Sequence, residues 1–131
     1  MKRKTNLRVL YVEDDQDSQD MVEIILRFAD IGVSAAGSID SAWQRAMSES
    51  FDLYLLDGKV KDGTTLGLCG KLREHSPDTP ILFYSGLAGQ DDIQNGLKAG
   101  ANGYLVKPYF GDLAEAVTKT VRSGGQKHEH R

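Results

Sequence analysis

Several polar residues that could do chemistry stand directly after short apolar runs of the chain. They are Glu13, Asp14, Asp57, Ser85 and Lys107. Clustered carboxylates repel one another unless a cation lies among them, and oxygen ligands without imidazole or thiolate suit a hard ion such as Mg²⁺. An aspartate can also act as a nucleophile toward phosphorus and form an aspartyl-phosphate. Phosphoryl transfer is therefore the chemistry that these residue types predict.

Each residue has a role in such a reaction. A metal held by the acids would neutralise charge on the incoming phosphoryl oxygens. Lys107 is a point charge on a flexible stem and could pair with the same oxygens, and Ser85 could donate a hydrogen bond to one of them. Asp57 needs no base, because a carboxylate is already ionised at neutral pH.

The apolar runs before these residues have the length and composition of strands. Predicted strands cover 7–12, 31–35, 53–56, 81–84 and 104–106. Longer amphipathic segments alternate with them, and predicted helices lie at 21–28, 38–49, 66–73, 91–99 and 113–121.

Two of these helices have a clear apolar face. The first carries apolar residues at the spacing i, i+3, i+4 and i+7, which marks one face of a helix: Met21, Ile24, Ile25 and Phe28. The second is predicted to begin after an N-cap residue, Ser38. Its residues predicted to face inward are Ala42, Trp43, Ala46 and Met47.

Five strands alternating with five helices predict a single three-layer α/β/α domain with a parallel sheet and right-handed crossovers. Ligands in such sheets bind beyond the carboxyl ends of the strands, which is where the polar residues stand. If the first and third strands are neighbours, Glu13, Asp14 and Asp57 converge on one edge.

Composition narrows the class of protein. The 131 residues are 40% hydrophobic, enough for one packed core, and 16 Lys+Arg against 19 Asp+Glu give a net charge of -3. This balance argues against a strongly basic nucleic-acid binder. One cysteine, Cys69, fits a reducing compartment, and no apolar run approaches the roughly 18 residues of a membrane span. A cytoplasmic location without membrane or direct nucleic-acid binding is therefore expected.

Four motifs carry a family resemblance. They are VLYVEDD at 9–15, FDLYLLDG at 51–58, PILFYSG at 80–86 and AGANGYLVKPY at 99–109. In this order and spacing the chain resembles a response-regulator receiver domain of bacterial two-component signalling, over residues 7–122. The resemblance implies a flavodoxin-like fold with strand order 2-1-3-4-5. It leaves a basic N-terminal segment at 1–6 and a flexible tail at 123–131.

The resemblance also implies a role for each site residue. Asp57 is the implied phosphoacceptor. Mg²⁺ or Mn²⁺ is held by Glu13, Asp14, Asp57 and the backbone carbonyl of Lys59. Ser85 and Lys107 bind the phosphoryl group, and Ser85 also matches the switch hydroxyl. Tyr104 matches the aromatic switch residue, and the Lys107–Pro108 bond resembles one that is usually cis.

A signalling switch of this kind implies protein partners rather than a small-molecule substrate. A sensor histidine kinase or a histidine phosphotransfer protein would donate to Asp57, and the domain would catalyse its own phosphorylation and slow dephosphorylation. A downstream protein target is expected on the face made by the fourth helix, fifth strand and fifth helix. Dimerisation on phosphorylation stays open, as do the cognate kinase, the stimulus and whether the domain stands alone.

The loop after Asp57 departs from the family pattern. Lys61 stands where proline is usual and Thr65 where glycine is expected. These changes predict a more mobile loop and a differently shaped helix start. Lys59 places a cation beside the acceptor, where the family tunes the lifetime of the phosphoryl group, and the direction of that effect does not follow from the sequence.

Other interpretations remain. The altered loop leaves room for a receiver-like interaction module that works without phosphorylation. A phosphohydrolase ranks last, because Lys59 stands where a second acid would be needed. Ser85 could serve only the turn at Gly86, and Tyr104 could serve only packing.

Overall fold

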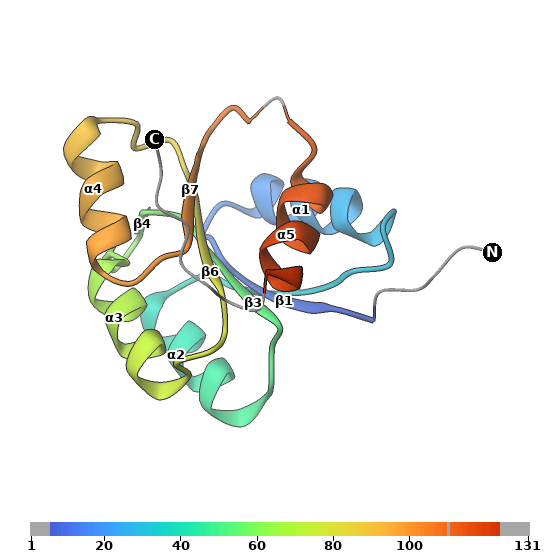
Figure 1. Cartoon of the computed structure of the whole chain (residues 1–131), viewed down its shortest axis with the longest axis horizontal. Coiled ribbons are helices and arrows are strands. Elements are labelled where there is room, and N and C mark those ends of the chain that lie inside the picture. Colours follow the sequence, from blue (N-terminus) through green and yellow to red (C-terminus); the bar gives the residue numbers. More distant parts are fainter. Residues whose placement is uncertain (1–5, 110, 124–131) are drawn as a thin grey trace.

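The computed structural model describes residues 6–109 and 111–123. Its centre is a five-stranded parallel sheet in the order β2-β1-β3-β6-β7, which confirms the predicted order of the five main strands (Figure 1). The strands are β1 (Arg8–Val12), β2 (Gly32–Ala36), β3 (Leu53–Leu56), β6 (Ile81–Ser85) and β7 (Gly103–Val106). The helices are α1 (Gln16–Arg27), α2 (Ile39–Ser48), α3 (Leu66–His75), α4 (Gln90–Lys98) and α5 (Leu113–Arg122).

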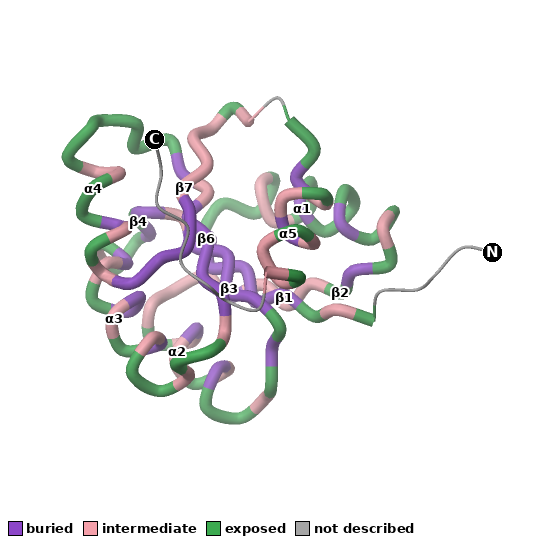
Figure 2. Tube along the Cα trace, in the orientation of Figure 1, coloured by how far each residue is buried: buried purple, intermediate pink, exposed green. Residues whose placement is uncertain are grey.

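Helices cover both faces of the sheet, so the three-layer α/β/α architecture is confirmed. One core cluster joins the sheet to α2 and α3 through residues such as Ala42 and Leu72. The other joins it to α1 and α5 through Val22, Leu26 and Val117. The central strands β1 and β3 are nearly all apolar because helices bury them on both sides, as the purple segments of Figure 2 show.

In α1, the apolar residues that were identified by their i, i+3, i+4, i+7 spacing lie on the exposed face of the helix. Val22 and Leu26, four positions apart, face the sheet and are buried. The residues with the helical spacing are exposed instead: Met21 59%, Ile24 54%, Ile25 36% and Phe28 81%. A helix on a sheet buries one narrow stripe, and here the second apolar stripe remains at the surface.

The inward face predicted for α2 is also partly wrong. Ala42 and Ala46 are buried and Trp43 is half-buried, but Met47 is 40% exposed. The small alanines bring the helix close to the sheet, and Met47 lies one position past the buried stripe. Ser38 does cap the helix, because its side chain accepts a hydrogen bond from the Ser41 amide at 3.1 Å.

A small hairpin follows β3, where the sequence predicted only a loop. Its strands are β4 (Lys59–Val60) and β5 (Gly63–Thr64), which pair antiparallel. Gly63 adopts a φ of 132°, a backbone conformation that glycine reaches without a steric penalty. The side chain of Asp62 accepts the Ile39 amide at 3.1 Å, so the hairpin is joined to the start of α2.

No described helix is long and apolar enough to cross a membrane. The basic residues of the predicted 1–6 segment, Lys2, Arg3 and Lys4, lie outside the described residues, as does the predicted tail beyond Ser123.

Candidate functional site

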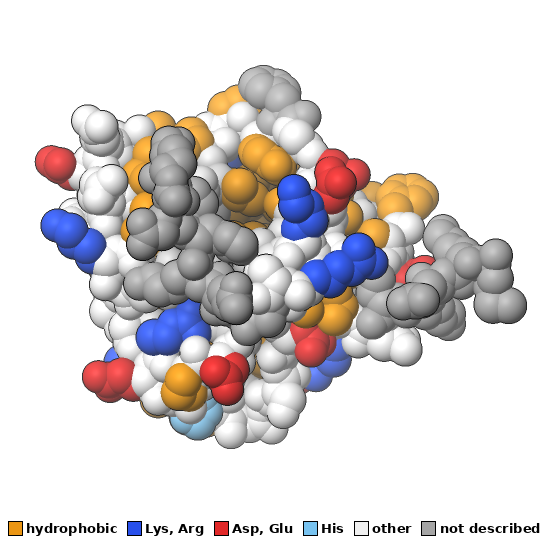
Figure 3. Space-filling view, viewed as in Figure 1, with side chains coloured by type: hydrophobic (Ala, Val, Ile, Leu, Met, Phe, Trp, Pro, Cys, Tyr) orange, Lys and Arg blue, Asp and Glu red, His pale blue; other side chains and the backbone are white. Residues whose placement is uncertain are grey.

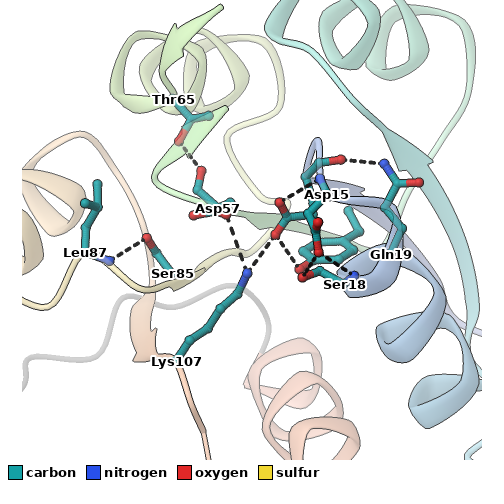
Figure 4. A network of polar contacts seen from close by, with 10 residues as sticks. Asp15, Ser18, Gln19, Asp57, Thr65, Ser85, Leu87 and Lys107 are labelled. Atoms are coloured by element: carbon teal, nitrogen blue, oxygen red, sulfur yellow. Dashed lines mark hydrogen bonds and ion pairs between the residues drawn. The ribbon is translucent and has the colours of Figure 1, made fainter. Parts of the chain in front are cut away.

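The predicted site residues stand at the carboxyl ends of the strands. Val12 pairs with Leu56 in the register of β1 and β3, so Glu13 and Asp57 leave the sheet side by side. Ser85 pairs with Val106, which brings Lys107 to the same edge. The strand order therefore gathers these four residues at one end of the sheet, and Figure 4 labels Asp57, Ser85 and Lys107 there.

Lys107 joins the two acids. Its ammonium lies 2.7 Å from Oε1 of Glu13 and 3.5 Å from Oδ2 of Asp57. The Glu13 side chain is only 3% exposed, whereas Asp57 keeps 16% and Lys107 keeps 23%. The Lys107–Pro108 peptide bond is cis. The acceptor candidate thus remains accessible, and the glutamate beside it is enclosed.

Burial and charge act in opposite directions on these groups. Burial raises the pKa of Asp57, and the neighbouring Glu13 raises it further, against the effect of Lys107. Burial alone would also raise the pKa of Glu13, but hydrogen bonds from Lys107 and the Asp15 amide lower it below the ordinary value. Burial would lower the pKa of Lys107, but the two carboxylates raise it. The cluster therefore favours an ionised Glu13 beside a charged Lys107, and it disfavours the ionised form of Asp57 relative to an exposed aspartate.

The hydroxyl of Ser85 lies beside this cluster and is fully buried. Its Oγ accepts the Leu87 amide at 3.1 Å, while the carbonyl of Leu87 accepts the Tyr104 hydroxyl at 2.6 Å. A Cβ atom at position 58 would lie 2.9 Å from this Oγ, so Gly58 is needed for the close approach. One residue of the β6–α4 loop thus connects both predicted switch residues.

One predicted metal ligand, Asp14, is not part of the hydrogen bonds and ion pairs described for this cluster. Asp14 is exposed and takes no part in the contacts described among Glu13, Lys107 and Asp57. The other ligand predicted there is the backbone carbonyl of Lys59, which lies in β4 two positions after Asp57. Within the described residues, no three acids, histidines or cysteines stand close enough to hold a metal ion. The donors do fit Mg²⁺ in kind, because they are carboxylate oxygens without a soft ligand.

Two contributors to the site were missed by sequence reasoning. Thr65 is buried, and its hydroxyl donates to the backbone carbonyl of Asp57 at 2.6 Å. Tyr11 is buried in β1, and its hydroxyl donates to Oε1 of Glu13 at 3.1 Å. Thr65 had been noticed only as a departure from the family, and Tyr11 resembled any other apolar strand residue.

Comparisons with known proteins place the chain in a family. Residues 9–118 match the family model described as the response regulator receiver domain. PilR of Pseudomonas aeruginosa is 31% identical over 116 residues, which cover 88% of this chain and 26% of PilR. The cell cycle response regulator CtrA of Brucella ovis is 31% identical over 106 residues, which cover 81% of this chain and 46% of CtrA. The chain therefore spans less than half the length of either relative.

Solved structures agree with this result. A CheY-like receiver domain protein from Methanospirillum hungatei superposes with a TM-score of 0.86 at 27% identity, covering 92% of this chain and 97% of that one. The fold is that of a receiver, and four of the predicted site residues meet at its carboxyl edge. The chain belongs to the response regulator receiver domain family. This membership is consistent with two-component signalling.

Proposed function

We propose that this domain accepts a phosphoryl group on Asp57 from a phosphohistidine, in a Mg²⁺-dependent step of a two-component phosphorelay. The observation that carries the proposal is the cluster of Asp57, Glu13 and Lys107 at the carboxyl edge of the sheet. The carboxylate is held in place and partly exposed, with a cation beside it. That is the arrangement a carboxylate nucleophile needs.

The chain's own residues account for most of the reaction. A carboxylate oxygen of Asp57 attacks phosphorus, the phosphorus–nitrogen bond of the donor breaks, and the imidazole leaves with the bonding electrons. Lys107, already 3.5 Å from Asp57, pairs with the transferred oxygens. Mg²⁺ held by Glu13, Asp14, Asp57 and the Lys59 carbonyl would neutralise charge on those oxygens. Slow hydrolysis of the aspartyl-phosphate would reset the switch.

The β6–α4 loop is suited to respond to phosphorylation of Asp57. Ser85 would turn its hydroxyl toward a phosphoryl oxygen and release the Leu87 amide, which it holds at 3.1 Å. Tyr104 holds the carbonyl of the same residue at 2.6 Å. A shift of Leu87 would therefore reach Tyr104 on β7, as a population shift between two loop arrangements.

A protein donor is supported by the surface beside Asp57. A hollow of about 290 Å³ is lined by Met21 of α1 together with Tyr84, Lys107 and Pro108. The exposed apolar face of α1, defined by Met21, Ile24, Ile25 and Phe28, continues from this rim. A sensor kinase or phosphotransfer protein that brings its histidine to Asp57 would cover this face.

A downstream protein target is proposed on the face of α4, β7 and α5. A hollow of about 600 Å³ lies on the β7 and α5 side of this face, lined among others by Tyr104, Leu105, Tyr109 and Lys119. Figure 3 shows hydrophobic side chains between β7 and α5, with basic side chains at the edge. The proposed compartment is the cytoplasm, and a second proposed output is dimerisation on phosphorylation.

The second candidate function is an interaction module that works without phosphorylation. The observation in its favour is Asp14, which is exposed and lies apart from the contacts of Glu13, Lys107 and Asp57. In that case Lys107 would serve only to neutralise Glu13 and Asp57, and the site would be a structural ion-pair cluster.

Measuring the intact mass of the protein distinguishes the phosphoacceptor function from the interaction module. The protein is incubated with a small phosphodonor such as phosphoramidate, with and without Mg²⁺, alongside Asp57→Asn and the exposed control Asp78→Asn. We expect one phosphoryl adduct on wild type and on Asp78→Asn, dependent on Mg²⁺, and none on Asp57→Asn. An adduct on Asp57→Asn would show that the acceptor is another residue. No adduct on any protein would favour the interaction module.

A further inference from the structure

Tyr11 brings a phenol into a strand where only apolar packing was expected. It lies in β1 between Ala35 of β2 and Leu55 of β3 in the strand register, and its side chain is fully buried. Aliphatic residues are common at buried positions of parallel strands. What tyrosine adds is a hydroxyl, and a buried phenol needs a hydrogen-bond partner.

That partner is the enclosed acid of the site. The Tyr11 hydroxyl donates to Oε1 of Glu13 at 3.1 Å, with both groups buried. Burial and the charge of Glu13 raise the pKa of Tyr11 far above its ordinary value.

Three donors hold the Glu13 carboxylate, and they differ in mobility. Oε1 is shared by Tyr11 and by Lys107, whose ammonium lies 2.7 Å away. Oε2 accepts the backbone amide of Asp15 at 3.1 Å. Tyr11 is fixed by the core and Asp15 by the backbone, whereas Lys107 sits on a flexible stem and also reaches toward Asp57. Only the lysine is free to leave Glu13 when a phosphoryl group arrives.

We propose that Tyr11 is a positioning residue for the metal site. Its hydroxyl keeps the Glu13 carboxylate in a fixed orientation after Lys107 turns to the phosphoryl group, and this orientation raises the affinity of the site for a divalent cation. The proposal rests on the proposed function, because it takes Glu13 as a metal ligand. Removing a hydrogen bond that orients a metal-ligating side chain typically lowers the metal affinity by 10–100-fold.

Direct measurement of metal binding tests the proposed role of Tyr11. Mg²⁺ and Mn²⁺ affinities of the unphosphorylated protein are measured by titration calorimetry for wild type and Tyr11→Phe, which keeps the ring and removes the hydroxyl. We expect Tyr11→Phe to weaken both affinities by about tenfold. The matched control is Tyr54→Phe, a buried tyrosine of β3 on the opposite face of the sheet. It should leave the metal affinities unchanged.

A double-mutant cycle shows whether the hydroxyl acts through Glu13. In a Glu13→Gln background, removing the Tyr11 hydroxyl should have no further effect on metal affinity. In a Lys107→Met background its removal should cost more than in wild type, because Tyr11 is then the remaining side-chain donor to Oε1. Equal losses in all three backgrounds would overturn the proposal.

The outcomes also separate this inference from the proposed function. If wild type binds neither cation and takes up no phosphoryl group, the proposed function fails. If wild type binds Mg²⁺ and Tyr11→Phe binds it equally well, only the role of Tyr11 is wrong. An equal loss in Tyr54→Phe would show that the effect is general softening of the core, and it too would overturn the proposal.

Discussion

Lys107 and Glu13 form an ion pair of 2.7 Å between residues 94 positions apart in the chain. The glutamate side chain is 3% exposed and the lysine 23%. A carboxylate this deeply enclosed is tolerated only with a cation or several donors beside it. The lysine proposed to bind the phosphoryl group is therefore also the counter-charge that allows Glu13 to stay ionised in the metal-free protein.

The first prediction concerns this second role of the lysine. Lys107→Met keeps the stem and removes the charge, and it should lower the free energy of unfolding by about 2 kcal/mol, less than for a fully buried pair because the lysine is partly exposed. Urea denaturation in the presence of a chelator measures the effect. The control Lys61→Met, at an exposed hairpin position, should change stability little. Equal midpoints for both variants would contradict the prediction.

The second prediction is a pH dependence at Asp57. Its pKa is raised in the folded protein by burial and by Glu13, so the folded state binds its proton more readily than the unfolded state. The ionised carboxylate therefore costs stability at neutral pH, and this cost disappears as the pH falls below the unfolded pKa of about 3.9.

Asp57→Asn removes that cost. In a chelating buffer it should raise the free energy of unfolding near neutral pH by about 1 kcal/mol, with the gain shrinking on acidification. Urea midpoints at several pH values measure it. A gain that stays constant down to acidic pH would point to packing rather than charge.

The third prediction concerns the loop after the acceptor. Thr65 donates to the Asp57 carbonyl at 2.6 Å and its amide donates to the Gly58 carbonyl at 3.1 Å. Thr65→Val keeps the shape of the side chain but leaves that carbonyl without this donor, which should cost about 1 kcal/mol of stability.

Hydrogen exchange of the amides between Gly58 and Thr64 should then become faster than in wild type. Thr65→Ser, which keeps the hydroxyl, is the matched control and should exchange more slowly than Thr65→Val. If all three proteins exchange alike, the hydrogen bond does not hold the loop. The same measurement on wild type tests the greater mobility predicted from Lys61 and Thr65.

The family resemblance implied the order of the sheet, and with that order the meeting of Glu13, Asp57 and Lys107 follows because strand ends in a parallel sheet share one edge. Sequence reasoning could not choose the buried face of α1, since both Val22–Leu26 and the Met21–Phe28 stripe have helical spacing. The hydrogen bonds of Thr65 and Tyr11 were also out of reach. They depend on the position of a single hydroxyl group in the folded chain, which the hydrophobic periodicity of the sequence does not indicate.

The fourth prediction compares two helical glycines. Gly96 of α4 is buried, and a Cβ atom there would lie 3.0 Å from the Phe83 ring and 3.1 Å from the Tyr104 ring, which stack on each other at 5.2 Å. Gly67 of α3 has nothing within 4 Å of the same position.

Alanine normally stabilises a helix interior relative to glycine by about 1 kcal/mol. Gly67→Ala, in the first turn of α3, should show a smaller gain in the same direction, whereas Gly96→Ala should lower stability by about 1 kcal/mol because the rings of Phe83 and Tyr104 must move away. Thermal unfolding measures both variants, and the ring shifts of Tyr104 in NMR spectra report its displacement. Equal gains in stability for Gly67→Ala and Gly96→Ala would mean that Tyr104 can move without an energetic cost.

The last prediction tests the exposed face of α1 as the contact for the phosphodonor protein. Ile24 and Phe28 are 54% and 81% exposed, so Ile24→Ser and Phe28→Ser should change the free energy of unfolding by no more than about 0.5 kcal/mol. Uptake from a small phosphodonor should stay as in wild type, because neither residue touches Asp57. Transfer from a phosphorylated kinase or phosphotransfer domain should slow by about tenfold, the loss of one good apolar contact.

Met47→Ser is the matched control for that experiment. Met47 is an exposed apolar side chain, 40% accessible, but it lies on α2 at the opposite face of the sheet. Its replacement should leave both reactions unchanged. If Met47→Ser slows protein-to-protein transfer as much as Ile24→Ser does, surface hydrophobicity in general is responsible. If neither Ile24→Ser nor Phe28→Ser slows it, the donor approaches Asp57 over a different part of the rim, because a partner seated on α1 cannot avoid these two side chains.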